Sequence, residues 1–429
     1  DLSGEGLGSL QPGLLRQIAP QVRSLDLSSN SLADVPETLA ALSLLRSLRL
    51  YNNDLEGFPY SFFTLTRLHQ LDLSKNNLTE IDERFTSLAH LQLFNASSNK
   101  LKQIDGIKNM QSLRTLILNH NMIETLHGEI TSLQNLEFFD CSDNVLHFIP
   151  IFFGRGEKAM ETTHNLRRLE ELDLGRNDLQ QFPPGLPGLT RLRVLSAHEN
   201  RLARLPADVG DLAGLVRLNL NKNMLTELPE SLCALPRLKT LSAAENELRA
   251  LPVGLGNLTA LEDLDISDNQ VSHLPDSFGS LPNLREAWLC RNALDALPAS
   301  FCNARSLEVL HLFGNNLRAL PMELGLLGNL VYLTAHKNQL AALPKSILLL
   351  EKLERLILHE NAKMEIWEEG RELLNFKSLV EISLDGRVLE KLAPSVMDWY
   401  DKYGVQSRAA ATFDDGGESI FKKISFLVS

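Results

Sequence analysis

The side chains best suited to metal binding or proton transfer lie between residues 286 and 359. His311, His336 and His359 are of the type that binds metals or transfers protons near neutral pH. Metal-bound histidines, however, are normally oriented by a neighbouring carboxylate, and the spacing of the sequence places none beside these three. The tripeptide His-Glu-Asn occurs at 198–200 and 359–361, but no second histidine follows at zinc-protease spacing. We therefore expect no metal site.

Other catalytic motifs are absent from the sequence. It contains no Gly-x-Ser-x-Gly nucleophile turn, no phosphate-binding P-loop and no Cys-x-x-Cys pair. Its polar residues recur at regular intervals along the chain, so they are not expected to converge in a cleft. These observations predict a protein that is not an enzyme and that carries no cofactor.

The composition excludes several classes of partner. The formal net charge is −12 and the chain has no run of Lys or Arg, which disfavours nucleic acid and anionic membranes. No apolar run approaches the roughly 20 residues of a membrane helix. The chain also has four widely separated cysteines, Cys141, Cys233, Cys290 and Cys302, as is typical of a reducing compartment. We expect a cytoplasmic protein without membrane insertion.

An internal repeat predicts the elements that position these side chains. The segments LRSLRLYNNDL (45–55), LHQLDLSKNNL (68–78) and LVRLNLNKNML (215–225) all fit Leu-x-x-Leu-x-Leu-x-x-Asn-x-Leu. The asparagine recurs fifteen times, at positions 30, 53, 76, 99, 121, 144, 177, 200, 223, 246, 269, 292, 315, 338 and 361. The interval is 23 residues throughout, except for one of 22 and one of 33. Such self-similarity predicts a solenoid of stacked repeats.

This pattern resembles the leucine-rich repeat family along nearly the whole chain. The resemblance implies an α/β repeat solenoid of horseshoe form, with a concave parallel β-sheet of about 16 strands and a convex face of short helical or extended segments. The Leu-x-Leu alternation fits one short strand per repeat, and segments such as LPADVGDL (205–212) suit the convex face. In the family, the asparagine turns inward and its amide bonds the backbone of neighbouring turns.

The register predicts which side chains face the core. If n is the position of the asparagine, n−5 and n−3 point inward, whereas n−6, n−4, n−2 and n−1 reach the concave face. Small and large residues alternate at n−3, as in Ala197, Leu220 and Ala243, which gives a 46-residue double repeat. The pattern breaks near Asn292, where the small residue is Ala287 at n−5. Alternating sizes let neighbouring layers interdigitate, so we interpret this period as core packing.

The same register gathers an aromatic and histidine patch on the concave face. Its expected members are Trp288, Phe313, Tyr332, His311, His336, His359 and Arg355. Exposed aromatics beside an arginine have the composition of interface hot spots, so we predict a partner-binding site. The alternative is that the C-terminal cap or tail covers the patch. Nearby, Asp263, Asp265 and Asp268 predict an acidic contact for a partner with basic residues.

The ends of the repeat and one insertion divide the chain. We expect a degenerate N-terminal repeat at 1–22, a solenoid at 23–378 with an insert at 154–165, a capping strand and helix at 379–403, and a tail at 404–429. Glu5 and Arg387 stand where the asparagine belongs in the two terminal repeats. Leu389, Leu392, Val396 and Tyr400 share one face of the expected capping helix. The polar insert is either a tolerated surface loop or a contact loop or regulatory site.

The tail contains a short motif. Lys423, Ile424 and Phe426 resemble the docking motif of type-1 protein phosphatase regulators, in which a basic residue precedes two apolar anchors. In that family, the motif adds to a sheet edge while the anchors fill pockets. The alternative is an apolar segment that packs back on the solenoid.

The 23-residue form without cysteine-rich caps resembles the intracellular leucine-rich repeat proteins of the Ras-scaffold type, including their plant relatives. That resemblance implies a non-enzymatic scaffold in signal transduction that binds a small GTPase or a phosphatase on its concave face. Two alternatives remain open. The chain could be the sensor region of a larger signalling enzyme, such as a cyclase, phosphatase or kinase. It could also be a secreted recognition or effector protein, with glycosylation at Asn77, Asn95 or Asn257.

Overall fold

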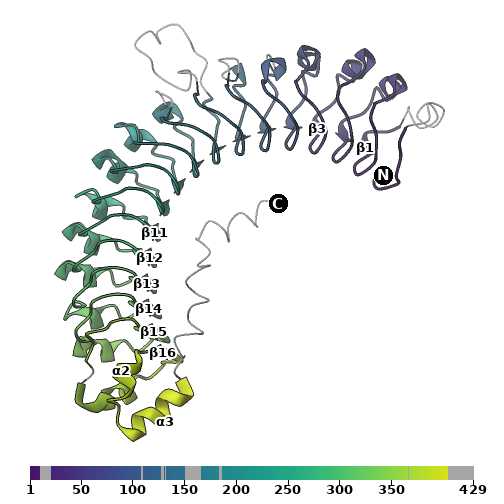
Figure 1. Cartoon of the computed structure of the whole chain (residues 1–429). Coiled ribbons are helices and arrows are strands. Elements are labelled where there is room, and N and C mark those ends of the chain that lie inside the picture. Colours follow the sequence, from purple (N-terminus) through teal and green to yellow (C-terminus); the bar gives the residue numbers. More distant parts are fainter. Residues whose placement is uncertain are drawn as a thin grey trace. The chain divides into compact units, whose positions relative to one another are not determined.

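The computed structural model describes residues 1–9, 21–107, 110–126, 130, 132–149, 166–182, 186–365 and 367–403. The chain divides into two compact units, unit 1 at residues 1–215 and unit 2 at residues 216–429. Within each unit, short strands line the concave side of a stack of repeats and 3-10 helices line its convex side (Figure 1). The predicted parallel repeat sheet is confirmed, because every pair of strands runs parallel and the strands follow chain order.

The described part of unit 1 contains eight strands and six 3-10 helices. The strands are β1 (Ser24–Asp26), β2 (Ser47–Arg49), β3 (Gln70–Asp72), β4 (Leu93–Asn95), β5 (Thr115–Ile117), β6 (Phe138–Asp140), β7 (Glu171–Asp173) and β8 (Val194–Ser196). The 3-10 helices are η1 (Glu37–Ala41), η2 (Tyr60–Thr64), η3 (Glu83–Ser87), η4 (Asp105–Ile107), η6 (Leu186–Gly188) and η7 (Val209–Asp211).

The described part of unit 2 adds eight strands. These are β9 (Arg217–Asn219), β10 (Thr240–Ser242), β11 (Asp263–Asp265), β12 (Glu286–Trp288), β13 (Val309–His311), β14 (Tyr332–Thr334), β15 (Arg355–Ile357) and β16 (Glu381–Ser383). Its convex elements are η8 (Glu230–Ala234), η9 (Leu255–Asn257), η10 (Asp276–Ser280), η11 (Ala299–Asn303), η12 (Leu324–Leu326), η13 (Lys345–Leu349) and η14 (Trp367–Asn375). Two α-helices follow β16, α2 (Gly386–Leu389) and α3 (Pro394–Tyr403).

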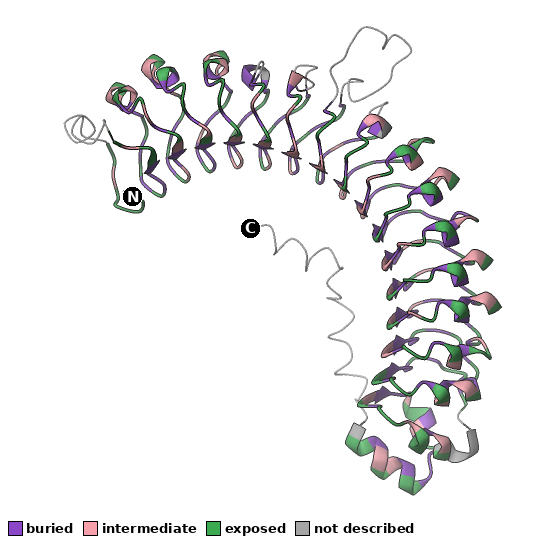
Figure 2. Ribbon diagram, turned by 180° about the vertical axis from the view of Figure 1, so that it is seen from behind, coloured by how far each residue is buried: buried purple, intermediate pink, exposed green. Residues whose placement is uncertain are grey.

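The core of each unit lies between the strands and the convex helices (Figure 2). The middle residue of each strand, n−5, is buried, and so is n−3 just after the strand. The alternating pair Leu220 and Ala243 is fully buried at n−3, as is Ala287 at n−5. Burial of one aliphatic side chain contributes roughly 1.5–3 kcal/mol, so the regular Leu positions supply the main driving force for stacking.

The buried asparagines hold successive repeats together. The amide nitrogen of Asn315 donates to the backbone oxygens of Leu289 and Leu312 at 3.0 Å and of Phe313 at 3.5 Å. Its side-chain oxygen accepts from the backbone N–H of Leu294 at 3.0 Å. One side chain therefore satisfies backbone groups of two turns, as a buried amide must. The same pattern recurs in unit 1, where Asn76 bonds four backbone groups.

The residue before each asparagine has a left-handed backbone. Fourteen described non-glycine residues have φ between 50° and 58°, and all of them stand at n−1. Gly314 holds the same position with φ of 67°. This conformation costs a residue with a Cβ about 1 kcal/mol or more, so it persists only because the asparagine ladder fixes the turn. The turn aims the n−2 side chain at the concave face.

The two ends of the described sheet are closed differently. At the start, Asn30 donates to Leu2 O and accepts from Leu7 N, both at 2.9 Å, which places Glu5 at the asparagine position of the first turn. At the other end, Arg387 stands at the asparagine position as predicted, five residues after the buried Ile382, but it is exposed in α2 rather than turned inward. The Asp385 carboxylate instead accepts from the backbone N–H groups of Glu360 at 2.7 Å and Asn361 at 2.8 Å.

The expected single capping helix is in fact two helices, because the chain turns between α2 and α3 ahead of Pro394. Leu392, Val396 and Tyr400 are buried as predicted, and Leu389 is half-buried. Helix α3 packs against η14 and β16. The last strand therefore has an apolar cover, as the end of a solenoid requires.

Candidate functional site

The candidate site lies on the concave face of unit 2, over strands β12–β16. Register pairs Trp288 of β12 with His311 of β13, and His311 with Thr334 of β14. It likewise aligns Glu286, Val309, Tyr332 and Arg355 along the neighbouring n−6 column. The predicted side chains therefore come together on adjacent strands. We call Trp288, His311, Tyr332, Phe313, His336, His359 and Arg355 the aromatic–histidine cluster.

One row of the cluster runs across the strands from Trp288. The ring centroids of Trp288 and His311 are 3.9 Å apart, and His311 meets the edge of Tyr332 at 5.1 Å. The guanidinium of Arg355 lies 5.7 Å from the centroid of the Tyr332 ring, within range of a cation–π interaction. Arg355 also pairs with Glu381 at 3.4 Å. The arginine therefore lies over the tyrosine ring while Glu381 holds its guanidinium.

A second row stacks at the n−2 positions. The rings of Phe313 and His336 are nearly parallel with centroids 4.7 Å apart, and His336 stacks on His359 at 4.5 Å. Nδ1 of His359 shares a hydrogen bond of 2.9 Å with the Ser383 hydroxyl. These ring distances match the spacing of about 4.8 Å between neighbouring strands. The sheet itself therefore sets up the stack.

The electrostatics of the cluster favour neutral rings. Burial, together with the nearby His336, lowers the pKa of His311 to about 4. Nδ1 of His311 shares a hydrogen bond of 3.1 Å with the Thr334 hydroxyl. Burial also raises the pKa of Tyr332, as does the charge of Glu381. At neutral pH, His311 and Tyr332 therefore present uncharged surfaces.

The expectation of fully exposed aromatics is wrong for part of the cluster. Phe313 is only 8% exposed, and His311, His336 and His359 are between 5% and 8% exposed. The reason is the stacking, since each ring covers the face of its neighbour. Trp288 and Tyr332 are half-buried and Arg355 is exposed, so these three form the accessible part of the cluster, together with half-buried Val309.

The prediction of an acidic contact is also wrong in part. Asp265 is only 3% exposed, and it accepts hydrogen bonds from the backbone N–H and the hydroxyl of Ser267. Asp268 is paired with Arg291 at 3.3 Å. Asp263 remains half-buried, and Glu286 is its neighbour across β11 and β12. Burial, together with the charges of Glu286 and Glu262, raises the pKa of Asp263 to about 6.

Glu286 is therefore the residue that the sequence-based selection of acidic contacts missed. Its n−6 position, one strand from Asp263, was the available signal. Asp263 lies on β11, one strand from Trp288, and Glu286 lies on β12, the same strand as Trp288. We call these two residues the acidic flank. The accessible surface of the site thus combines two half-buried aromatics with a negatively charged side.

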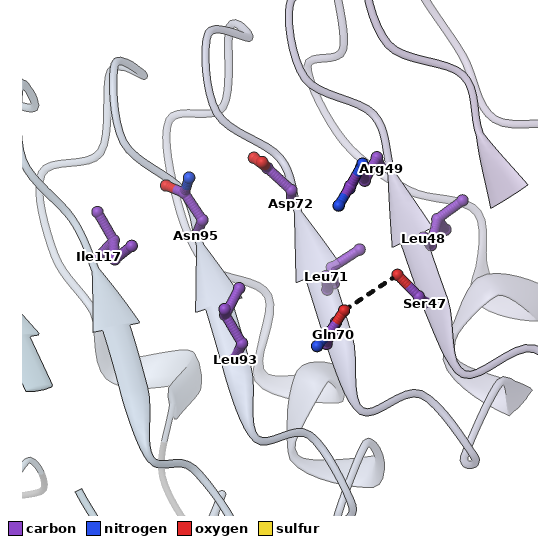
Figure 3. Close-up of a pocket in the computed structure, with 9 residues that line it drawn as sticks. All are labelled: Ser47, Leu48, Arg49, Gln70, Leu71, Asp72, Leu93, Asn95 and Ile117. Carbon is purple, nitrogen blue, oxygen red and sulfur yellow. Dashed lines mark hydrogen bonds between the residues drawn. The ribbon is translucent and has the colours of Figure 1, made fainter. Parts of the chain in front are cut away.

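Unit 1 has a different concave surface. A hollow of about 170 Å³ lies over β2–β5, and Figure 3 shows its lining residues. Most of the concave side chains that line it are polar, including Ser47, Gln70, Asp72 and Asn95. Ser47 donates to Gln70 at 3.3 Å, and Asp72 accepts from Ser74. This hollow lacks an aromatic anchor, so it is the weaker candidate for a protein-binding site.

Several further features bear on the site. The motif residues Lys423, Ile424 and Phe426 and the insert at 154–165 lie outside the described residues. Within the described ranges, no three His, Cys, Asp or Glu side chains are grouped so as to hold a metal ion. Nor does any helix in that part of the chain have the length and apolar character needed to cross a membrane. The four cysteines are all buried and free.

Comparisons with known proteins agree with this architecture. A family model described as a leucine-rich repeat region matches residues 151–287, and a second, described as leucine rich repeat, matches residues 259–317. None of the curated proteins compared with the chain matches it.

Solved structures extend the likeness to most of the chain. A leucine-rich repeat protein of Leptospira interrogans is 29% identical with a TM-score of 0.69, over 92% of this chain and 94% of that one. A plant peptide hormone receptor in complex with RGF2 is 25% identical with a TM-score of 0.63, over 90% of this chain and 67% of that one. An internalin of Listeria monocytogenes, at 18% identity and a TM-score of 0.61, shares the fold alone over 81% of this chain and 88% of that one. With the asparagine ladder and the parallel sheet, these matches show that the chain has the leucine-rich repeat fold, and the family models match such repeats within residues 151–317.

Proposed function

We propose that this chain is a non-enzymatic scaffold or adaptor that binds a protein partner on the concave face of unit 2. The observation that carries the proposal is the pair of half-buried aromatics, Trp288 and Tyr332, which both pack against the buried ring of His311. Large rings that are already held in place lose little entropy on binding, and Trp and Tyr are enriched at interface hot spots. Leucine-rich repeats commonly serve as protein-binding surfaces.

We further propose that the scaffold acts in intracellular signal transduction, in the cytoplasm, with a small GTPase or a type-1 protein phosphatase as its partner. The free, buried cysteines support a reducing compartment, because secreted domains usually oxidise such residues to disulfides. The tail residues Lys423, Ile424 and Phe426 support a phosphatase as the partner. Purified phosphatase should bind the full chain and lose affinity for the Ile424→Ala/Phe426→Ala variant. Equal binding of both would remove the phosphatase from consideration.

A second candidate function is recognition by part of a larger receptor or signalling enzyme. The observation in its favour is the similarity to a plant peptide hormone receptor in complex with RGF2. The full open reading frame separates the two candidates. A transmembrane segment or a catalytic domain in that frame favours the receptor or enzyme, whereas its absence favours the stand-alone scaffold. Glycosylation of Asn257, which is exposed, would place the protein outside the cytoplasm.

The proposal is tested by capture of partners from native extract with matched variants. The test variant is Trp288→Ala/Tyr332→Ala, which removes the accessible rings without opening the buried stack of Phe313. The control is Val253→Ala/Met322→Ala, because both side chains are more than 70% exposed elsewhere on unit 2. Proteins captured by the wild type and the control should be lost with the test variant. Equal capture by all three would reject the concave face of unit 2 as the binding surface.

A further inference from the structure

The acidic flank and Trp288 together define the chemistry of one contact. We propose that the concave face over β10–β12 binds a basic side chain, lysine or arginine, within a peptide segment of the partner. This inference rests on the proposed function and adds the kind of residue that the partner must present.

The first observation is a pair of carboxylates without a counter-ion. Asp263 and Glu286 are register partners on β11 and β12, and both are half-buried. Neither forms an ion pair with any residue in the described part of the chain. The neighbouring Glu262 is different, since it pairs with Lys239. Two like charges held side by side repel each other, and a cation placed between them removes the repulsion.

The second observation is a buried hydroxyl on β10, the strand next to that of Asp263. Ser242 is fully buried, and its Oγ has no hydrogen-bond partner in the described structure. It belongs to the concave n−4 column, in which register pairs Ser242 with Asp265 and Asp265 with Trp288. A buried polar atom without a partner carries a desolvation cost of roughly 1–3 kcal/mol. A cationic N–H donor can offset that cost, since a hydroxyl oxygen accepts.

The third observation is the indole of Trp288. Its Nε1 is a buried donor that also has no partner among the described residues. The ring lies against His311 of β13 with ring centroids 3.9 Å apart, so the face away from His311 lies on the side of β11, where the register partner of Trp288 is Asp265, two residues from Asp263. A cation between that face and the carboxylates would gain a cation–π interaction as well as two charge-assisted hydrogen bonds.

These groups also specify the form of the ligand. Lysine and arginine side chains supply donors only, so they match Asp263, Glu286 and the Ser242 oxygen. The indole N–H needs an acceptor, which a backbone carbonyl of a peptide supplies and a free polyamine does not. The ligand that satisfies every group is therefore a basic residue inside a peptide chain.

The acidic flank lowers the stability of the fold, which is typical of functional sites. The burial and the charge repulsion that raise the pKa of Asp263 also destabilise the folded state, and a functional role accounts for such a cost. We therefore expect Asp263→Asn to leave the free energy of unfolding unchanged or raised. This expectation separates a loss of binding from a loss of fold.

The experiment selects phage-displayed random peptides against the full chain. Peptides of about 12 residues are long enough to cross β10–β15 at about 4.8 Å per strand. Affinities of the synthetic peptides are then measured for wild type, Asp263→Asn/Glu286→Gln and the control Asp276→Asn/Glu323→Gln. The control makes the same charge change at exposed positions in η10 and just before η12. Spermine, a cation without an acceptor, serves as a competitor.

The proposal predicts that selected peptides share a Lys or Arg and bind the flank variant at least 10-fold more weakly, with less than a 2-fold change for the control. Replacing the basic residue of the peptide by Ala should weaken binding to the wild type by the same factor. The same replacement should not weaken binding to the flank variant further, since both changes remove the same contact. Selected peptides without a basic residue, or equal affinity for the flank variant, would overturn it. Displacement by spermine at the peptide's own affinity would overturn the requirement for a peptide.

The outcomes also separate this inference from the proposed function. Peptides that lose affinity for Trp288→Ala/Tyr332→Ala but not for the flank variant leave the concave binding surface intact and remove only the basic contact. Failure to select any peptide or capture any partner that depends on Trp288 would remove both.

Discussion

At the scale of single residues, the site is governed by rings that cover one another. A strand spacing of about 4.8 Å is close to the separation at which aromatic rings stack, so an aromatic or histidine at the same position of successive repeats buries its neighbour. Phe313, His336 and His359 show this effect. Trp288 and Tyr332 differ because each keeps part of its ring accessible.

Buried His311 makes the stability of unit 2 depend on pH. Its pKa is lowered from 6.5 to about 4, so between these values the unfolded chain binds more protons than the folded one. The free energy of unfolding therefore falls as the pH drops from 6.5 to 4, by up to about 3 kcal/mol at 1.36 kcal/mol per pKa unit. Replacing His311 by Gln should remove this component, and urea unfolding at pH 7 and pH 4 measures it.

The comparison must be made between variants, because other groups act in the opposite direction. The pKa values of Asp140 and Asp263 are raised to about 6, so their stabilising contribution is present at low pH and is lost as the pH rises from 3.8 to 6. That contribution is common to the wild type and to His311→Gln. The exposed His273→Gln variant should behave as the wild type. Parallel pH profiles for the wild type and His311→Gln would contradict the account.

At the scale of the element, the turn after each strand is fixed by the asparagine. Replacing Asn315 by Asp removes the donors to Leu289, Leu312 and Phe313 and places a negative charge among these carbonyl oxygens. We expect a loss of about 3 kcal/mol or more, because buried groups are left unpaired. The neighbouring Asn316→Asp is the matched control, since Asn316 is exposed. Equal urea midpoints for the two variants would show that the ladder is not what holds the turn.

The sequence predicted the strands and the inward asparagines but not the conformation of the residue before them. A repeated Leu-x-Leu and a fixed Asn are visible in one sequence, since each reflects a side chain that must be buried or bonded. The left-handed backbone at n−1 has no such signal in the sequence. Position n−1 is held by Lys75, Glu245 and Arg291 as well as by Gly314, so residue type does not reveal it.

The sequence likewise predicted the side-chain directions in the candidate site but not the exposure of every side chain. The register placed Trp288, Tyr332 and Arg355 on one face correctly, because side-chain direction alternates along a strand. It failed for the exposure of Phe313 and Asp265, because burial on a concave face depends on what the adjacent repeat presents. The hydrogen bonds from Ser267 to Asp265 and the stacking of His336 on Phe313 determine the outcome. Periodicity gives the neighbouring positions but not how far one side chain covers the next.

At the scale of the whole molecule, stability is the sum of contacts between neighbouring repeats, so each end needs a partner for its last open backbone groups. Asp385 supplies that partner by accepting from Glu360 N and Asn361 N. In Asp385→Ala, amide exchange at these two residues should accelerate by about 10-fold or more, while strands in unit 1 keep their protection. Hydrogen exchange with mass spectrometry measures both regions. The exposed Asp398→Ala in α3 is the control, and unchanged exchange at 360–361 would contradict the capping role.

The central claim, that unit 2 binds a protein partner through the accessible rings of its concave face, is tested most directly by one affinity measurement. A purified partner or selected peptide is titrated against wild type, Trp288→Ala/Tyr332→Ala and the control Val253→Ala/Met322→Ala, each checked for native circular dichroism. The account predicts that the test variant binds at least about 30-fold more weakly, the equivalent of roughly 2 kcal/mol, with no change for the control. Equal affinity of all three proteins, with the fold intact, would contradict it.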